Sequence, residues 1–259
     1  MTRLILEIEQ SLEANASRYF DKAKKIRKKK EGALEALAST EKKLKQLEKS
    51  LVKEIQDLAL EAKRKARSLE WFEKFRWFRT SEGFFVLGGR DATSNEIVVK
   101  KHTTSTDLIF HTDIAGSPFF VLQTEGKKVS DVSKREVAIA TASFSRAWKM
   151  GVATTPVFYV NAEQVSKKAL AGEYLVKGAF MVYGKKNYVD NALGCALGAF
   201  DGKLMAGPLS AVKKHCSEYI EIVQGREKPS KVAKLVQKKL GFTVDEIIRA
   251  LPTGGVGVK

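Results

Sequence analysis

The first 70 residues constrain the fold most, because they carry a continuous helical pattern of apolar residues. This stretch contains no proline, and its only aromatic residues are Tyr19 and Phe20. Apolar or small residues recur at steps of three and four, which places them along one face of a helix. They are Leu12, Ala16, Tyr19, Ala23, Ile26, Ala33, Leu37, Leu44, Leu47, Leu51, Ile55, Leu58 and Ala62. The pattern predicts a coiled-coil helix in residues 1–70.

We expect a single helix of roughly 55 residues, which would be roughly 80 Å long. The alternative is a hairpin that folds back near Glu31–Ser39, where only Gly32 interrupts the helical pattern. A lone heptad helix cannot bury its apolar seam. The seam therefore predicts a partner helix, from a second copy of the chain or from another protein.

The composition favours a cytoplasmic protein with a polyanionic partner. The 259 residues include 46 Lys and Arg against 30 Asp and Glu, a formal net charge of +16, and 44% are hydrophobic. Such a charge attracts nucleic acid. There is no apolar run of membrane-spanning length and no signal-peptide pattern at the start, so we expect no membrane partner. The two cysteines, Cys195 and Cys216, fit no zinc or disulfide spacing and are expected to be reduced thiols.

The sequence pattern changes at residue 71, where aromatic residues become dense. Trp71, Phe72, Phe75, Trp77 and Phe78 lie within eight positions. Because Trp71 and Phe75 are four residues apart, we expect the helix to continue here and to anchor in a hydrophobic core. The alternative is that these rings stack on nucleic-acid bases.

The remaining segments predict an α+β fold with a mainly antiparallel sheet and flanking helices. We divide it into a domain at 71–202 and a carboxyl-terminal extension at 203–259 that packs on the domain. The expected strands are 84–87, 108–111, 119–123, 157–160, 174–176, 180–183, 193–200 and 219–223. The expected helices are 133–149, 231–240 and 244–251, and the glycine-rich end at 253–259 is expected to fray.

Motifs of catalysis are missing from the sequence. It contains no P-loop, no HExxH, no paired CxxC and no GxSxG. His111 and Asp113 alternate on an expected strand, so an acid–base pair or a metal site built from them, with Arg90 nearby, is the enzymatic alternative. We expect a structural histidine instead, no enzyme, and no cofactor or metal.

Gly88-Gly89-Arg90-Asp91 lies between an expected strand and an expected helix start. Thr93-Ser94-Asn95-Glu96 fits a capping box, which predicts a short helix that ends near His102. Glycines at a helix N-terminus attract phosphate, and Arg90 would add a bidentate contact. The alternative is a tight turn closed by an Arg90–Asp91 pair.

Two basic clusters suit an RNA phosphate backbone. Seven of the nine residues at 22–30 are Lys or Arg. The second cluster combines 164–168, 172–174 and 184–187, and its aromatic residues are Tyr174, Phe180, Tyr183 and Tyr188. A solvated surface would explain either cluster equally well. The candidate RNA contacts are Arg90, Lys100, Lys101, Lys167, Lys168, Lys185 and Lys186, together with Lys25, Lys28 and Lys29 on the helix.

Six ordered motifs across about 130 residues resemble one known family. They are Trp71–Phe78, Gly88–Ala92 with Asn95-Glu96 and Lys100-Lys101, His111–Ile114, Gln164–Lys167, Gly172–Leu175 and Gly184–Asn187. The chain resembles the NFACT-R domain and the preceding coiled coil of the NFACT family, whose members include nuclear export mediator factor, RqcH and fibronectin-binding protein A.

The resemblance implies ribosome-associated quality control, with large ribosomal subunit RNA and tRNA as partners. The family's amino-terminal NFACT-N domain, its helix-hairpin-helix region and the first coiled-coil strand are absent from this sequence. We therefore expect the missing amino-terminal half, or a second copy, to pair with the coiled coil. The family's acidic–arginine motif belongs to NFACT-N, so Arg90-Asp91 is not that motif, and tail elongation by this chain alone is not expected. The alternative is a coiled-coil scaffold without RNA recognition of its own.

Overall fold

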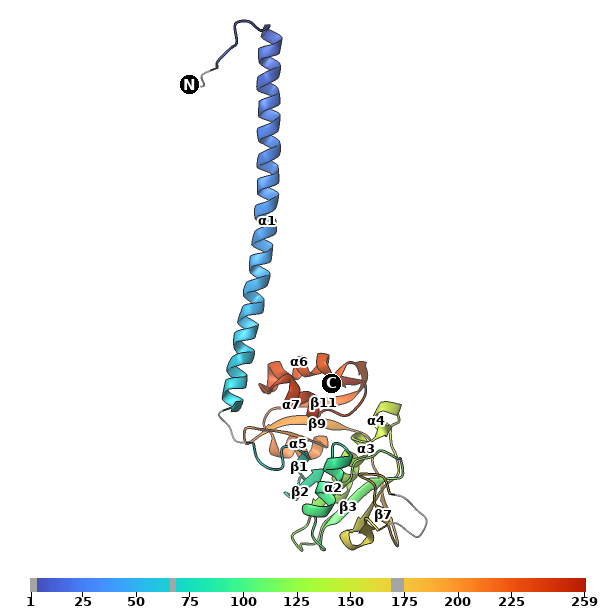
Figure 1. Ribbon diagram of the computed structural model, residues 1–259. Helices are drawn as coiled ribbons and strands as arrows, with labels where there is room; N and C mark the ends of the chain where they lie inside the picture. The colour runs from blue at the N-terminus through green and yellow to red at the C-terminus, as the bar shows by residue number, and fades with distance from the viewer. Residues whose placement is uncertain (1–3, 66–68, 169–174) are drawn as a thin grey trace. The chain divides into compact units, whose positions relative to one another are not determined.

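The computed structural model describes residues 4–65, 69–168 and 175–259, leaving aside the side chains of residues 53 and 56–65. The chain divides into two compact units, 1–62 and 63–259. Helices and strands are labelled in Figure 1. No helix in the described residues has both the length and the apolarity needed to cross a membrane.

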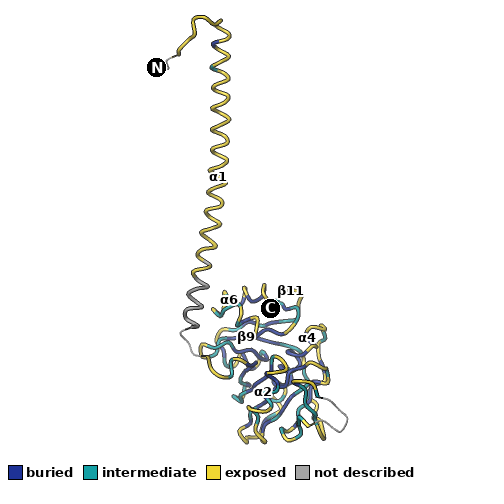
Figure 2. The backbone as a smooth tube through the Cα atoms, in the orientation of Figure 1, coloured by how far each residue is buried: buried dark blue, intermediate teal, exposed yellow. Residues whose placement is uncertain are grey.

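The first unit consists mainly of α1 (Leu12–Lys65), which runs for 54 residues as one helix. The single helix is confirmed and the hairpin is not formed, since Gly32 lies within the helix with open space around it. Figure 2 shows the described part of α1 exposed along almost its whole length. The apolar seam is therefore uncovered within this unit, with Leu37 58% and Leu47 65% exposed.

Residues 4–11 fold back along the first turns of α1. The Tyr19 hydroxyl donates to the Ile5 carbonyl at 2.8 Å, and Ile5 N donates to the same hydroxyl oxygen at 3.0 Å. Asn15, which is buried, exchanges two hydrogen bonds with the backbone of Glu7 at 2.9 and 3.0 Å. Two polar side chains of α1 thus hold the segment that precedes it.

The second unit is built on a six-stranded sheet in which every pairing is antiparallel. The strand order is β1-β2-β4-β3-β5-β8. Its strands are β1 (Arg76–Arg79), β2 (Phe85–Gly88), β3 (Leu108–Thr112), β4 (Phe120–Gln123), β5 (Val157–Asn161) and β8 (Asn187–Val189). Helix α3 (Asp131–Ser143) packs on β3, β4 and β5. The expected α+β class with an antiparallel sheet is confirmed.

A second antiparallel sheet has the order β10-β9-β11-β12. It consists of β9 (Cys195–Phe200), β10 (Lys203–Gly207), β11 (Tyr219–Glu227) and β12 (Val256–Val258). The helices α5 (Leu209–His215), α6 (Pro229–Leu240) and α7 (Val244–Ala250) pack on it. The smaller elements of the unit are α2 (Ala92–Lys101), α4 (Arg146–Met150), the 3-10 turn Ala162–Gln164, β6 (Val165–Ser166) and β7 (Met181–Val182).

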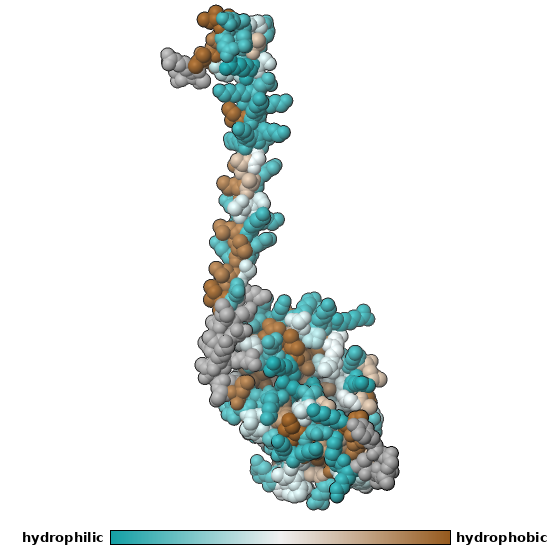
Figure 3. Space-filling view, in the orientation of Figure 1, coloured by the Kyte–Doolittle hydropathy of each residue, from teal (hydrophilic) through white to brown (hydrophobic). Residues whose placement is uncertain are grey.

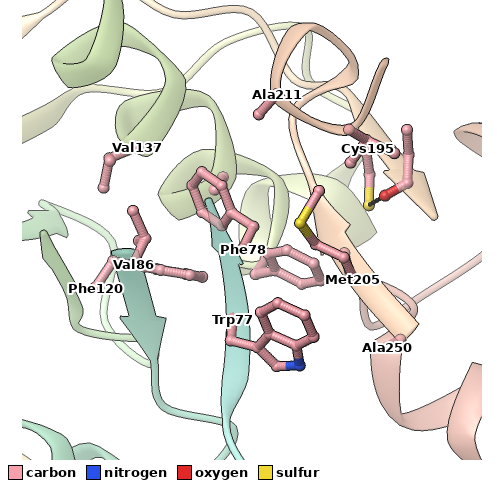
Figure 4. Packing of buried hydrophobic residues seen from close by; sticks show 14 of the residues in the cluster. Trp77, Phe78, Val86, Phe120, Val137, Cys195, Met205, Ala211 and Ala250 are labelled. Carbon is pink, nitrogen blue, oxygen red and sulfur yellow. Dashed lines mark hydrogen bonds between the residues drawn. The ribbon is translucent and has the colours of Figure 1, made fainter. Parts of the chain in front are cut away.

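One hydrophobic core joins the two sheets (Figure 4). Phe78 of β1 is fully buried and lies against β10, where a Cβ at Gly207 would come within 2.8 Å of the Phe78 ring. A glycine is therefore required for this close approach. Buried Glu136 of α3 adds a polar link, because it accepts from Ser81 N at 2.7 Å and from Ser210 Oγ at 2.6 Å.

The helix does not continue into the aromatic segment, so that expectation was wrong. Helix α1 ends at Lys65, residues 71–74 form turns, and Trp77 lies in β1. Trp77 and Phe78 are both buried, because β1 lies between its neighbour β2 and the covering elements β10 and α5. Trp71 is 46% exposed and stacks on His102 at 4.4 Å between ring centroids.

Four further details differ from the expectations. Helix α2 begins two residues early, because Asp91 rather than Thr93 caps it and Ser94 completes the box. The helix expected at 133–149 divides at Phe144, where Ser145 caps α4. The chain end does not fray, since β12 pairs with β11. The strand expected at 174–176 is not formed at 175–176, and residue 174 lies outside the described residues.

Candidate nucleic-acid interface

A basic groove lies at the edge of the six-stranded sheet, beside β8. It encloses about 550 Å³ between α3, β5 and the turn that leads into β8. Lys134 and Arg135 come from α3, and Lys185 and Lys186 come from the turn. We call this site the edge groove; its lining also includes Asp131, Tyr159, Asn187, Tyr188, Val189 and Asp190.

Cationic side chains outnumber carboxylates in the edge groove. Four of its side chains are Lys or Arg and two are Asp, which leaves two positive charges in excess. Arg135 and Lys185 are exposed and form no ion pair within the described residues. These two groups are free to contact an anion.

The other two cations of the groove are held by the protein. Lys186 Nζ lies 3.1 Å from Asp113 Oδ1 and 4.3 Å from the Phe158 ring centroid. Lys134 Nζ lies 3.1 Å from Asp131 Oδ1. Burial is the largest single influence on Lys134 and lowers its pKa. The hydrogen bond to Asp131 and the interactions with the Asp131 charge and Tyr159 together outweigh burial, so the pKa is raised. Both amines are therefore positioned by the fold.

Aromatic rings border these cations. Tyr188 is 58% exposed, and its hydroxyl donates to Asp113 Oδ2 at 3.1 Å. The ring of Tyr159 lies 5.4 Å from Lys134 Nζ. Exposed rings beside cations provide stacking surfaces for bases next to contacts for phosphates.

Lys167, a predicted RNA contact, is bonded within the domain. Its Nζ lies 2.6 Å from Glu96 Oε1 and donates to the carbonyls of Val176 and Ala179 at 3.1 and 2.9 Å. Glu96 also accepts from Gly178 N at 3.1 Å. The hydrogen bond from Lys167 lowers the pKa of Glu96 to about 2. Lys167 thus fixes the segment before β7 against α2.

The other predicted lysines of the domain are more open. Lys100 is exposed and lies 3.5 Å from Glu96 Oε2, a weak pairing. Lys101 and Lys168 are exposed and form no ion pair within the described residues. On α1, Lys25, Lys28 and Lys29 are all exposed. The motif residues 172–174 lie outside the described residues.

Arg90 is partly buried and forms no ion pair with Asp91 within the described residues. Its Nη2 donates to the carbonyls of Phe75 at 3.1 Å and Glu73 at 3.4 Å, while Asp91 caps α2. Neighbouring Arg76 is buried and donates from Nη1 to Gly89 O at 2.6 Å. The turn at Gly88–Asp91 is therefore closed by arginine-to-carbonyl bonds.

The geometry does not form the acid–base pair expected as an alternative. His111 Nε2 lies 3.2 Å from the Ser117 carbonyl, and its ring stacks on Phe119 with centroids 4.1 Å apart. Asp113, just past the end of β3, is bonded to Lys186 and Tyr188. Burial lowers the pKa of His111. These contacts fit a structural histidine.

No cluster of three or more metal-ligating side chains occurs among the residues described. Cys195 and Cys216 are buried free thiols, and burial raises their pKa values to about 12 and about 11. Neither thiol is therefore activated as a nucleophile.

The sequence did not identify Lys134, Arg135 or Tyr159 as site residues. All three lie far from Lys185 in the sequence, and they meet it only because α3 packs beside β5 and β8. The available signal was the polar face of the amphipathic helix, where adjacent Lys134 and Arg135 alternate with core positions such as Val137.

Comparison with known proteins finds an RNA-binding domain family and relatives from ribosome quality control. Residues 74–184 match the family described as the NFACT protein RNA binding domain. The archaeal protein aRqcH of Methanocaldococcus jannaschii is 37% identical over 206 residues, which cover 76% of this chain and 31% of that protein. The human ribosome quality control complex subunit NEMF is 40% identical over 181 residues, which cover 68% of this chain and 16% of that subunit. The chain thus spans at most about a third of these relatives.

Among solved structures, the carboxyl-terminal part of the fibronectin/fibrinogen-binding protein of Streptococcus suis is similar at 20% identity. The TM-score is 0.39, and the match covers 48% of each chain.

Proposed function

The chain belongs to the NFACT family, of which it carries the RNA-binding domain, and we propose that it binds RNA in ribosome quality control. The proposed partners are tRNA and the RNA of the large ribosomal subunit. We propose a cytoplasmic binding role that uses no catalytic residue or cofactor of this chain.

The edge groove is the observation that supports this proposal most. It combines two unpaired cations, Arg135 and Lys185, with two positioned ones and the ring of Tyr188. A phosphate backbone needs contacts of this kind, which give affinity without sequence choice. The exposed basic residues of α1 at 22–30 provide a second contact surface on the other unit.

Titration of the whole chain with tRNA and with purified large subunits, at two salt concentrations, tests the proposal. We expect Arg135→Ala combined with Lys185→Ala to weaken binding about tenfold and to reduce the salt slope by about 1.5. The matched control is Lys238→Ala with Lys239→Ala, which removes the same charge from the exposed face of α6. Equal losses in both double variants would indicate non-specific attraction, and binding that ignores salt would contradict the proposal.

A coiled-coil scaffold is the second candidate function. Figure 3 shows apolar side chains recurring along α1, and Leu37, Leu44 and Leu51 are each more than half exposed. An uncovered seam of this kind favours a helical partner, either an amino-terminal NFACT half or a second copy. Sedimentation of the chain and of the variant Leu37→Asp with Leu44→Asp tests this function. If the seam mediates self-association or partner binding, the variant should lose that association.

A further inference from the structure

A cavity of about 430 Å³, separate from the edge groove, lies where α2 begins. Its walls come from the start of α2, the turn between β3 and β4, the segment 176–180, and Phe144. The volume falls within the range of roughly 300–1,000 Å³ that is usual for small-molecule sites. The cavity can therefore hold one small ligand but no helical nucleic acid.

Two arginines give this cavity its charge. Arg76 is 7% exposed and Arg90 is partly buried, and both line the cavity. The Nε–H groups of both arginines are buried and have no hydrogen-bond partner within the described residues. Buried donors without partners are rare in folded proteins, and the two guanidinium groups also place positive charge in the wall of the cavity.

Other polar groups at the cavity also donate. Asn95 uses its Oδ1 to accept from Phe119 N at 3.1 Å, and its Nδ2 bonds to nothing in the described part of the chain. Lys177 is exposed at the rim. The one carboxylate of the lining, Asp91, is occupied in capping α2. The lining therefore has an excess of donors and of positive charge, which suits an anionic, acceptor-rich ligand.

An aromatic surface completes the cavity. His111 and Phe119 stack with their ring planes 26° apart, and Phe180 meets Phe119 edge-on with centroids 5.3 Å apart. Burial lowers the pKa of His111, which favours the neutral form of its ring. A flat ring of the ligand would find apolar and aromatic contacts here, beside the arginines.

The wall formed by 176–180 is held in place by contacts with α2 and Lys167. Gly178 has φ +82°, and a Cβ there would lie 2.6 Å from Ala92 Cα. Its amide donates to Glu96, which is in turn bonded to Lys167. The lysine that sequence reasoning assigned to RNA thus shapes the cavity.

We infer that this cavity, the two-arginine cavity, binds one unpaired nucleotide of a bound RNA, with its phosphate against Arg76 and Arg90 and its base against the His111–Phe119 surface. The inference rests on the proposed RNA-binding function and adds a site at which a single nucleotide is received. A free ribonucleotide shares this chemistry, so the test separates the two sources.

The three histidines supply the readout, because His111 lines the cavity whereas His102 and His215 do not. The ring signals of the whole chain are followed by ¹H–¹³C NMR during titration with adenosine 5′-monophosphate, adenosine, inorganic phosphate and a single-stranded oligoadenylate. We expect saturable shifts of His111 alone, with the oligoadenylate binding at least tenfold more tightly than the mononucleotide, and weaker effects of adenosine or phosphate.

A cavity-filling variant tests the location. Ala115 is exposed in the lining, so Ala115→Phe blocks the cavity without changing charge, and Ala153→Phe on an exposed turn outside it is the matched control. Ala115→Phe should weaken oligoadenylate binding at least tenfold while Ala153→Phe leaves it unchanged. Thermal unfolding of both variants checks that the fold is retained, and Lys177→Ala at the rim serves as a second variant that should weaken binding severalfold.

Several results would overturn the inference. These are an unmoved His111, shifts with inorganic phosphate equal to those with nucleotide, shifts with the mononucleotide but not with the oligoadenylate, or unchanged oligoadenylate affinity in Ala115→Phe. If tRNA binding is lost through Arg135 and Lys185 but survives Ala115→Phe with His111 unmoved, RNA binding stands and the cavity inference falls. If the chain binds neither tRNA nor oligoadenylate, the proposed function falls as well.

Discussion

The basic residues of α1 and those of the globular unit have very different surroundings. At residues 22–30 every side chain is exposed, because a lone helix offers its charges nothing to pack against. In the globular unit, Lys167 and Arg90 bond to backbone carbonyls, and Lys186 bonds to Asp113. A lysine in the packed unit can therefore either hold the fold together or contact a ligand. Only its contacts in the structure show which of the two roles it has.

The strongest test of this difference compares one glutamate from each region. Glu136→Ala removes the acceptor of Ser81 N and Ser210 Oγ in a buried site, so we expect the unfolding free energy to fall by about 2–3 kcal/mol. Glu48→Ala on exposed α1 should change it by less than about 0.5 kcal/mol. Urea unfolding of both variants measures this, and comparable losses would remove the contrast.

The second test concerns free charges on α1. Replacing Lys25, Lys28 and Lys29 by alanine should weaken binding to large subunits about tenfold and reduce the salt slope by about 2–3. The trio Lys42, Lys43 and Lys45, exposed on the same helix, is the control and should lose less than about threefold. Equal effects would mean that α1 acts only through its total charge.

A smaller effect is expected at a helix cap. Thr243 Oγ1 accepts from Glu246 N at 3.3 Å at the start of α7, so Thr243→Ala should cost about 1 kcal/mol of stability. Thr40 lies in the middle of exposed α1, and Thr40→Ala should be nearly neutral. Thermal unfolding distinguishes the two, and a neutral Thr243→Ala would show that the cap is dispensable.

The smallest change is a pH effect at Glu96. Its pKa of about 2 lies below the ordinary 4.5, chiefly because of the hydrogen bond from Lys167. The charged form therefore contributes its full stabilisation above pH 4.5, and this contribution is lost as the pH falls toward 2. Carboxyl ¹³C titration should show the low midpoint, and Lys167→Ala should move it up toward 4.5. An unmoved midpoint would show that Lys167 is not the cause.

Much of the fold could be predicted because its signals are local. The strands near 85–88, 108–112, 120–123 and 157–161 are short apolar runs between turn residues, and the seam of α1 has a clear helical period. The extension of the helix into Trp71 and Phe75 failed because a spacing of four fits a helix but also occurs by chance in a dense aromatic cluster. Tertiary packing decided between these outcomes, and β10 and α5, short and interrupted by Gly207-Pro208, gave too weak a pattern to predict.

The candidate site was less predictable, because it is formed by residues that are distant in the sequence and come together only in the folded chain. The sequence identified Lys185 and Lys186 from their motif, but it ranked Lys167 equally, although Lys167 is bonded to Glu96 and two carbonyls. Arg76 and Arg135 were not selected at all. Their roles come from distant partners: the loop at Gly89 for Arg76 and the edge strand β8 for Arg135.

The core shared by the two sheets, where Phe78 lies against Gly207, has a thermodynamic consequence. Neither sheet can lose its inner face without exposing the other, so the unit at 63–259 should melt in a single cooperative transition. The described side chains of α1 contribute to no such core, and the helical signal of α1 should decline gradually with temperature unless a partner covers the seam. A calorimetric scan would then record one sharp peak on a sloping background, and a partner that binds α1 would convert the slope into a second peak.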